Sequence, residues 1–169
     1  FIPTSRPFDL FNPDRKSRMQ LYINRVFITE ECEDIVPAWL RFVRGVVDTP
    51  DLDLNVSREM LQHNPSVVKI GKAVVKRILT ELQKKKDKDP KAYAEFWAEF
   101  GIVLKEGLYE DQDNRDKLLK LSLFASAKKG ELISLADYIA AMPEKQDKIY
   151  TLSAETAEQA QTSPHLEGF

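Results

Sequence analysis

Residues 65–88 carry the strongest periodic pattern in the chain, PSVVKIGKAVVKRILTELQKKKDK. Apolar side chains recur there at the three- and four-residue spacing of a single helix face. These side chains are Val67, Val68, Ile70, Val74, Val75, Ile78, Leu79 and Leu82. The pattern predicts a long amphipathic helix with a basic, solvated end, and such a helix buries its apolar face against a second layer of structure.

The residues before this helix alternate between extended and helical patterns. Prolines in residues 1–18 predict an extended arm, for which we expect Phe8, Leu10 and Phe11 as anchors. The next predicted elements are a strand covered on both faces, a helix limited by Pro37, a short strand and a third extended piece. They span residues 19–28, 29–43, 42–48 and 49–56, respectively. This alternation predicts a layered α/β sandwich.

The pattern changes after the lysine run. Two helical segments, 93–111 and 114–126, follow one another with no strand between them, which is typical of a helical connector. Ser134 and Asp137 then form a plausible capping box for a helix over 130–142. A strand over 147–152 and a helix over 153–164, ended by Pro164, complete the start of a smaller α/β unit. The expected division is a larger α/β subdomain over 1–86, the connector over 87–129 and the smaller subdomain over 130–169.

Composition excludes several classes of function. With 25 Lys and Arg against 27 Asp and Glu, the net charge is -2, so we expect no nucleic-acid partner. No apolar run reaches membrane-spanning length, so we expect no membrane partner. The single cysteine, Cys32, fits a reducing compartment, which we take to be the cytoplasm. His63 and His165 lack neighbours at metal spacing, so no metal site is predicted.

Nothing in the chain resembles a phosphate cradle, because neither GxGxxG nor a P-loop is present. We therefore expect the chain by itself not to be an enzyme and not to hold a nucleotide tightly. Trp39, Phe96, Trp97 and Phe100 are expected in the core or at a subdomain interface. Phe27 ends a strand and could be exposed, although a core position is the plainer interpretation.

Residues 54–62, LNVSREMLQ, place a cation where a helix disfavours it. Ser57 is predicted to be the helix cap. Arg58 would then lie in the first turn, beside the positive end of the helix dipole. A phosphate would resolve this placement, since guanidinium and helix-start amides both bind phosphate oxygens. Gln62, four residues on, and Asn55, before the cap, could face the same point. The residues alone favour a plainer alternative, an ion pair between Arg58 and a local carboxylate.

The stretch RGVVDTPDLDLNVSREMLQ, together with FIPTSRPFDLF, FWAEFGIVLKEGLYED and SPHLEGF, resembles the middle segment of the ninety-kilodalton heat-shock chaperone family, above all its bacterial members. The resemblance covers essentially the whole chain. It implies an α/β sandwich that lacks its first strands, a short helical connector and a truncated second α/β unit. Asn24, where a basic residue is expected, and IYTLSAET in place of the usual pattern depart from the family.

The resemblance also implies a role for each site residue. Arg58 would reach the terminal phosphate of ATP, bound with magnesium by the preceding ATP-binding domain of the parent chain. Gln62 and Asn55 would belong to the same catalytic loop, and Phe27 would help to dock the ATP-binding domain. The implied function is an ATP-hydrolysing, homodimeric chaperone that binds unfolded client proteins. The alternative is a non-catalytic interaction module in which Arg58 is only structural.

Overall fold

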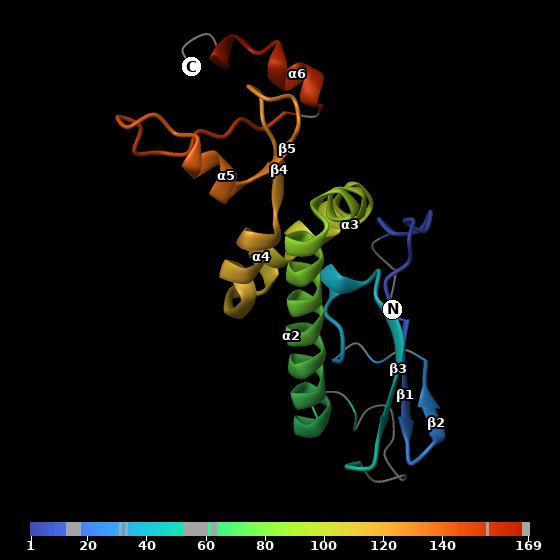
Figure 1. Cartoon of the computed structure of the whole chain (residues 1–169). Helices are drawn as coiled ribbons and strands as arrows, with labels where there is room; N and C mark the ends of the chain where they lie inside the picture. The colour runs from blue at the N-terminus through green and yellow to red at the C-terminus, as the bar shows by residue number, and fades with distance from the viewer. Residues whose placement is uncertain are drawn as a thin grey trace. The chain divides into compact units, whose positions relative to one another are not determined.

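The computed structural model describes residues 1–12, 18–30, 32, 34–52, 61, 64–154 and 156–166. The chain forms two compact units, Phe1–Leu118 and Leu119–Phe169, each with its own small sheet and helices (Figure 1). This is the mixed α/β class that the sequence predicted. The expected subdomain boundaries at residues 86 and 129 stay predictions. Among the described helices, none combines the length and the apolarity that a membrane crossing requires.

Unit 1 contains a three-stranded sheet of order β2-β1-β3. The strands are β1 (Arg18–Ile23), β2 (Val26–Thr29) and β3 (Arg44–Thr49). β1 pairs antiparallel with β2 and parallel with β3. In Figure 1, β1 and β3 both run toward the end of unit 1 at which helix α2 (Pro65–Lys88) begins. The strand predicted over 42–48 is confirmed as β3.

The single strand expected over 19–28 is wrong, because these residues form the β1–β2 hairpin. Asn24 and Arg25 make its two-residue turn with positive φ angles of 48° and 68°. Asparagine adopts this left-handed conformation more readily than most residues, which allows the chain to reverse here. The expectation that both faces are covered also fails for β2, where Val26 and Phe27 are exposed.

The helix expected over 29–43 is also wrong. Thr29 ends β2, and the only helical turn among the described residues of this range is the 3-10 helix η1 (Ala38–Leu40). Pro37 precedes it with ψ of 162°, and proline also pushes the residue before it toward extended backbone. Of the third extended piece, residues 53–56 lie outside the described residues.

The N-terminal arm is anchored by one side chain rather than three. Leu10 is fully buried, whereas Phe8 and Phe11 are exposed. Tight turns, in which Leu10 N donates to Pro7 O at 3.1 Å and Asn12 N donates to Asp9 O at 3.1 Å, direct successive side chains to different sides. The expectation for Phe8 and Phe11 is therefore wrong.

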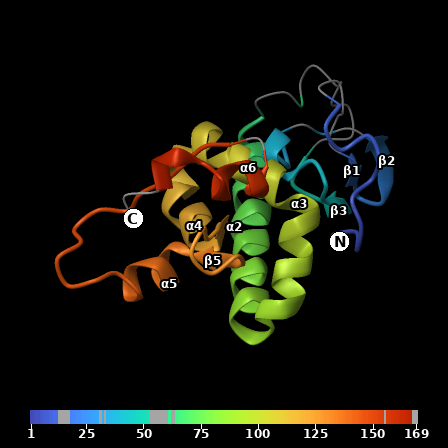
Figure 2. The same ribbon diagram turned by 90° about the horizontal axis from the view of Figure 1, so that it is seen from above.

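Two long helices complete unit 1, and both were predicted. Asn64 caps α2 by accepting a hydrogen bond from Ser66 N at 2.9 Å, and Pro65 occupies the first turn. Asp89 ends α2 and caps α3 (Pro90–Glu110) by accepting from Ala92 N at 2.9 Å. Figure 2 shows the three strands gathered at one side of unit 1, with α2 and α3 beside them.

The core of unit 1 is aromatic. The expected core positions of Trp39, Phe96, Trp97 and Phe100 are all confirmed as buried. Phe42, just before β3, stacks on Phe100 with ring centroids 4.7 Å apart. The ring contacts join the segment before β3 to α3, and such pairs add to the free energy that area burial alone provides.

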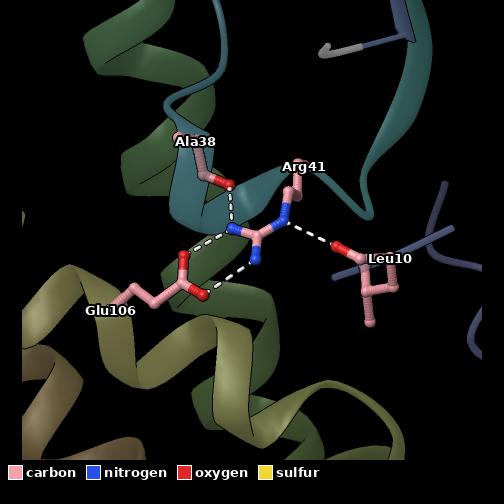
Figure 3. Close-up of polar contacts among 4 residues, drawn as sticks. All are labelled: Leu10, Ala38, Arg41 and Glu106. Carbon is pink, nitrogen blue, oxygen red and sulfur yellow. Dashed lines mark hydrogen bonds and ion pairs between the residues drawn. The ribbon is translucent and has the colours of Figure 1, made fainter. Parts of the chain in front are cut away.

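Arg41 joins three separate segments of unit 1 through its guanidinium (Figure 3). Nε donates to Leu10 O in the arm at 2.8 Å, and Nη1 donates to Ala38 O in η1 at 3.1 Å. Both terminal nitrogens bind the carboxylate of Glu106 on α3, with Nη2 2.8 Å from Oε1. The Arg41 side chain is only 12% exposed, so these contacts are largely shielded from water.

Unit 2 begins within helix α4 (Arg115–Leu121), which follows the 3-10 helix η2 (Gln112–Asn114). Its sheet is the antiparallel pair β4 (Leu123–Ala125) and β5 (Leu132–Ser134). The helix predicted over 114–126 therefore ends at Leu121, since pairing with β5 draws the following residues into a strand.

The capping box of Ser134 and Asp137 is confirmed at the start of α5 (Leu135–Ala140).

Residues 147–152 form no strand, so the strand predicted there is wrong. The amide of Tyr150 donates instead to the Tyr138 hydroxyl at 3.3 Å. The helix predicted over 153–164 is shorter. It is capped by Thr156 and observed as α6 (Ala157–Gln161), and the 3-10 helix η3 (Pro164–Leu166) follows.

Gly71 on α2 lies where a side chain does not fit. A Cβ at this position would be 2.4 Å from Asp34 O and 3.2 Å from Ile35 O, and backbone atoms cannot move aside cheaply. We expect Gly71→Ala to lower the free energy of unfolding by about 1–3 kcal/mol, despite the better helix propensity of alanine. Urea unfolding measures this. Lys72→Ala on the exposed side of α2 is the control, and equal stability of the two variants would contradict the expectation.

Arg41→Lys should separate the geometry of the Arg41 contacts from their charge. A lysine keeps the cation but cannot form the planar fork to Glu106, so we expect a loss of about 1–3 kcal/mol in the free energy of unfolding. The matched control is Arg77→Lys, since the Arg77–Glu81 pair on α2 has side chains 76% and 46% exposed and its replacement should change little. Similar effects of the two substitutions on urea unfolding would refute the expectation.

Candidate functional site

Three of the four predicted site residues lie outside the described residues. Arg58, Gln62 and Asn55 fall in the ranges 53–60 and 62–63, as do Ser57 and His63. The described residues that neighbour them in the sequence are buried or hydrogen-bonded. Leu52, before them, is 7% exposed, and Leu61, among them, is 4% exposed. Asn64 N donates a hydrogen bond to Leu61 O at 3.1 Å. Helix α2 begins at the next residue, Pro65.

The segment that carries Arg58 starts at a defined edge of the sheet. β1 and β3 are parallel, with Tyr22 opposite Asp48 and Ile23 opposite Thr49, so their carboxyl ends lie together. The chain continues from β3 through Pro50 to Leu52 at this edge. In open α/β sheets, ligands bind outside the carboxyl ends of the strands. The segment that contains Arg58 therefore begins at the edge where such sheets place their binding residues.

Phe27, the fourth predicted residue, lies on the surface. Its side chain is 51% exposed, so the plainer interpretation of a core position is wrong and the exposed alternative is correct. Its ring packs edge-on against Tyr22 of β1 with centroids 5.5 Å apart, which fixes its orientation. Val26, its neighbour in β2, is also exposed. Together they place apolar surface beside the β1–β2 turn.

The turn itself borders the same edge. Asn24 N donates to Thr49 O at 3.3 Å, and Arg25 N donates to Asp48 Oδ1 at 3.2 Å. These bonds tie the hairpin turn to the end of β3. Asn24, Arg25, Asp48 and Pro50 line a small open depression there. The sequence interpretation did not single out Arg25. The available signal was an asparagine in the pair Asn24–Arg25 between the β-branched residues Ile23 and Val26, which is compatible with a tight hairpin turn.

The described residues at this edge do not form a complete nucleotide or metal site. No group of three or more His, Cys, Asp or Glu side chains capable of holding a metal occurs in the part of the chain that the structure describes. The pKa shifts resolved on unit 1 lie elsewhere. On α3, burial lowers the pKa of Lys105 and raises that of Tyr93, and on α2 the hydrogen bond from Lys84 lowers the pKa of Glu81. Among the described residues, this edge carries the cationic side chain of Arg25 and the exposed ring of Phe27.

Comparison with known proteins places the chain in a family. The family described as Hsp90 protein matches residues 1–169. The chaperone protein HtpG of Paramagnetospirillum magneticum is 55% identical over 169 residues, and that of Roseobacter denitrificans is 53% identical over 169 residues. Each alignment covers 100% of this chain and 27% of the relative, so the chain spans about a quarter of the length of these proteins.

A solved structure agrees with these relatives. The middle domain of a Plasmodium falciparum heat shock protein has a TM-score of 0.84 and 30% sequence identity, covering 99% of this chain and 65% of that one. The predicted resemblance, including its emphasis on bacterial members, is confirmed. The chain belongs to the Hsp90 family and has the fold of its middle domain.

Proposed function

We propose that this chain is the middle segment of an ATP-dependent molecular chaperone. In this proposal Arg58 contacts the terminal phosphate of an ATP that a separate ATP-binding domain of the same parent chain holds with magnesium. The observation that supports the proposal concerns the described residues on either side of Arg58 in the sequence. β3 ends at the carboxyl edge of a parallel strand pair, and Leu52 and Leu61 are buried.

The chemistry of the proposal is electrostatic. Hydrolysis redistributes negative charge around the terminal phosphoryl group, and a positioned guanidinium stabilises that charge. Gln62 and Asn55 add uncharged hydrogen-bonding groups in the same segment. Because the arginine and the nucleotide belong to different domains, the full catalytic site would form only when the domains dock.

Phe27 supports the docking part of the proposal. Its exposed ring, held by Tyr22, and the exposed Val26 offer apolar surface next to the edge from which the Arg58 segment departs. Aromatic side chains at such positions are common anchors of protein interfaces. We propose this surface as part of the contact with the ATP-binding domain.

Client binding is the second part of the proposal. Unit 2 exposes several large apolar side chains that unfolded polypeptides could contact, namely Leu132, Ile139, Ile149, Tyr150 and Leu152. We further propose that the parent chain is a cytoplasmic homodimer, in keeping with its family. The competing function is a non-catalytic interaction module in which Arg58 only pairs with a nearby carboxylate; the same exposed side chains would serve that role.

The decisive variant is Arg58→Ala in the full-length parent. We expect the single-turnover rate of ATP hydrolysis to fall roughly 10- to 100-fold while nucleotide affinity barely changes. The expected loss is smaller than the ~10³–10⁵ seen for arginine fingers in GTPases, because domain docking shares the work. Arg115→Ala removes an exposed arginine from α4, far along the chain from the site, and serves as the control. Unchanged hydrolysis in Arg58→Ala would favour the interaction module.

A further inference from the structure

The hydroxyl of Tyr138 ties a surface loop of unit 2 back to helix α5. It accepts a hydrogen bond from Gln146 Nε2 at 3.0 Å and a second one from the amide of Tyr150 at 3.3 Å. A phenol oxygen can accept these bonds and still keep its own proton, so one group holds two points of the loop. The loop that leaves α5 after Ala140 therefore comes back to the helix at Tyr150.

The side-chain amide of Gln146 is used twice. Its nitrogen also donates to Lys148 O at 2.8 Å, so both of its protons have acceptors. The backbone amide of Gln146 donates to Pro143 O at 2.9 Å, which closes a turn within the loop. Tyr138, Gln146 and Tyr150 thus form a small polar cluster that defines the path of the loop.

Hydrogen bonds matter in this loop because it has no packed core. The structure describes every residue from 141 to 154, and none of them is buried. Apolar burial, the main stabilising term in folded proteins, therefore contributes little to the conformation of this stretch. Such a stretch opens readily unless polar contacts hold it. Helix α5 offers a fixed base for these contacts, because the capping box of Ser134 and Asp137 joins its start to β5.

The two residues joined by the backbone bond stand next to exposed apolar side chains. Ile139 follows Tyr138 on α5, and Ile149 precedes Tyr150, whose own ring is half exposed. Leu152 lies two residues further on and is also exposed. The bond from Tyr150 to Tyr138 therefore brings together apolar side chains from two segments that are separate in the sequence. Four of the five side chains proposed above for client contact lie on these two segments.

We propose that Tyr138 is a positioning residue for client binding. Its hydroxyl holds the 141–150 loop against α5, so that Ile139, Ile149 and Leu152 present one apolar surface to an extended, apolar segment of an unfolded polypeptide. The inference rests on the proposed function and deepens its client-binding part. Apolar side chains gathered at one place mark an interaction site, whereas scattered ones do not. A loop that is already in place also avoids the entropic cost of being ordered on contact.

The test is Tyr138→Phe in the full-length parent, because phenylalanine keeps the ring and removes only the hydroxyl. Binding of reduced, carboxymethylated lactalbumin, an unfolded polypeptide, is followed by fluorescence anisotropy. We expect its dissociation constant to rise about three- to tenfold, as the loss of one or two hydrogen bonds in a surface loop would allow. Tyr109→Phe is the matched control, since it removes the hydroxyl of an exposed tyrosine on α3 of unit 1.

Hydrogen exchange separates the loss of these bonds from general unfolding. In Tyr138→Phe, the amides of residues 149–152 should exchange faster, whereas exchange in α5 and the melting temperature should stay near those of the wild type. Gln146→Ala removes one of the two donors and should weaken binding less. Combined with Tyr138→Phe it should add little, because both substitutions act on the same contact. Wild-type affinity of Tyr138→Phe, additive effects of the two substitutions, or faster exchange throughout unit 2 would each overturn the inference.

The failure of this inference is distinguishable from failure of the proposed function. Ile139→Ser combined with Ile149→Ser tests the client surface directly in the same anisotropy measurement. If this double variant binds the unfolded polypeptide more weakly while Tyr138→Phe binds it normally, only the positioning inference is wrong. If both bind it normally, unit 2 is not the client surface and the inference falls with that part of the proposal. Hydrolysis by Arg58→Ala judges the catalytic part separately.

Discussion

The guanidinium of Arg41 holds together parts of unit 1 that the sequence places far apart. It binds the arm at Leu10, the turn at Ala38 and helix α3 at Glu106, all through one planar group (Figure 3). A guanidinium buried to this degree needs every donor directed at an acceptor, so the three segments constrain one another. The aromatic stacking of Phe42 on Phe100 lies one residue further along and depends on the same arrangement.

That arrangement determines where β3 starts, and β3 determines where the candidate site lies. Its parallel pairing with β1 brings two carboxyl ends together and ties the β1–β2 turn to Thr49 and Asp48. In the sequence, the segment that carries Arg58 follows β3 and precedes α2. The catalytic proposal thus depends on one edge of one small sheet.

Elements with strong local signals were predictable. Helix α2 has its apolar period and the Asn64–Pro65 start, α3 has its aromatic face, and α5 has the capping box of Ser134 and Asp137. The errors occur where a local signal competes with pairing or with backbone geometry. Thr29 and the acidic residues after it resemble a helix start, but Thr29 is used to end β2. Residues 147–152, DKIYTL, resemble a strand, yet none of the described strands pairs with them.

The sequence by itself determined the family, the α/β class, the two long helices and the aromatic core, because these depend on periodicity and on a long specific motif around Arg58. Only the tertiary structure decided that residues 19–28 form a hairpin, that Phe27 is exposed and that Arg25 occupies a left-handed position beside Asp48. The physical reason is that exposure and turn conformation depend on which strands pair and in which register. A β-strand acquires its neighbours from distant parts of the chain, whereas a helix makes its hydrogen bonds within itself.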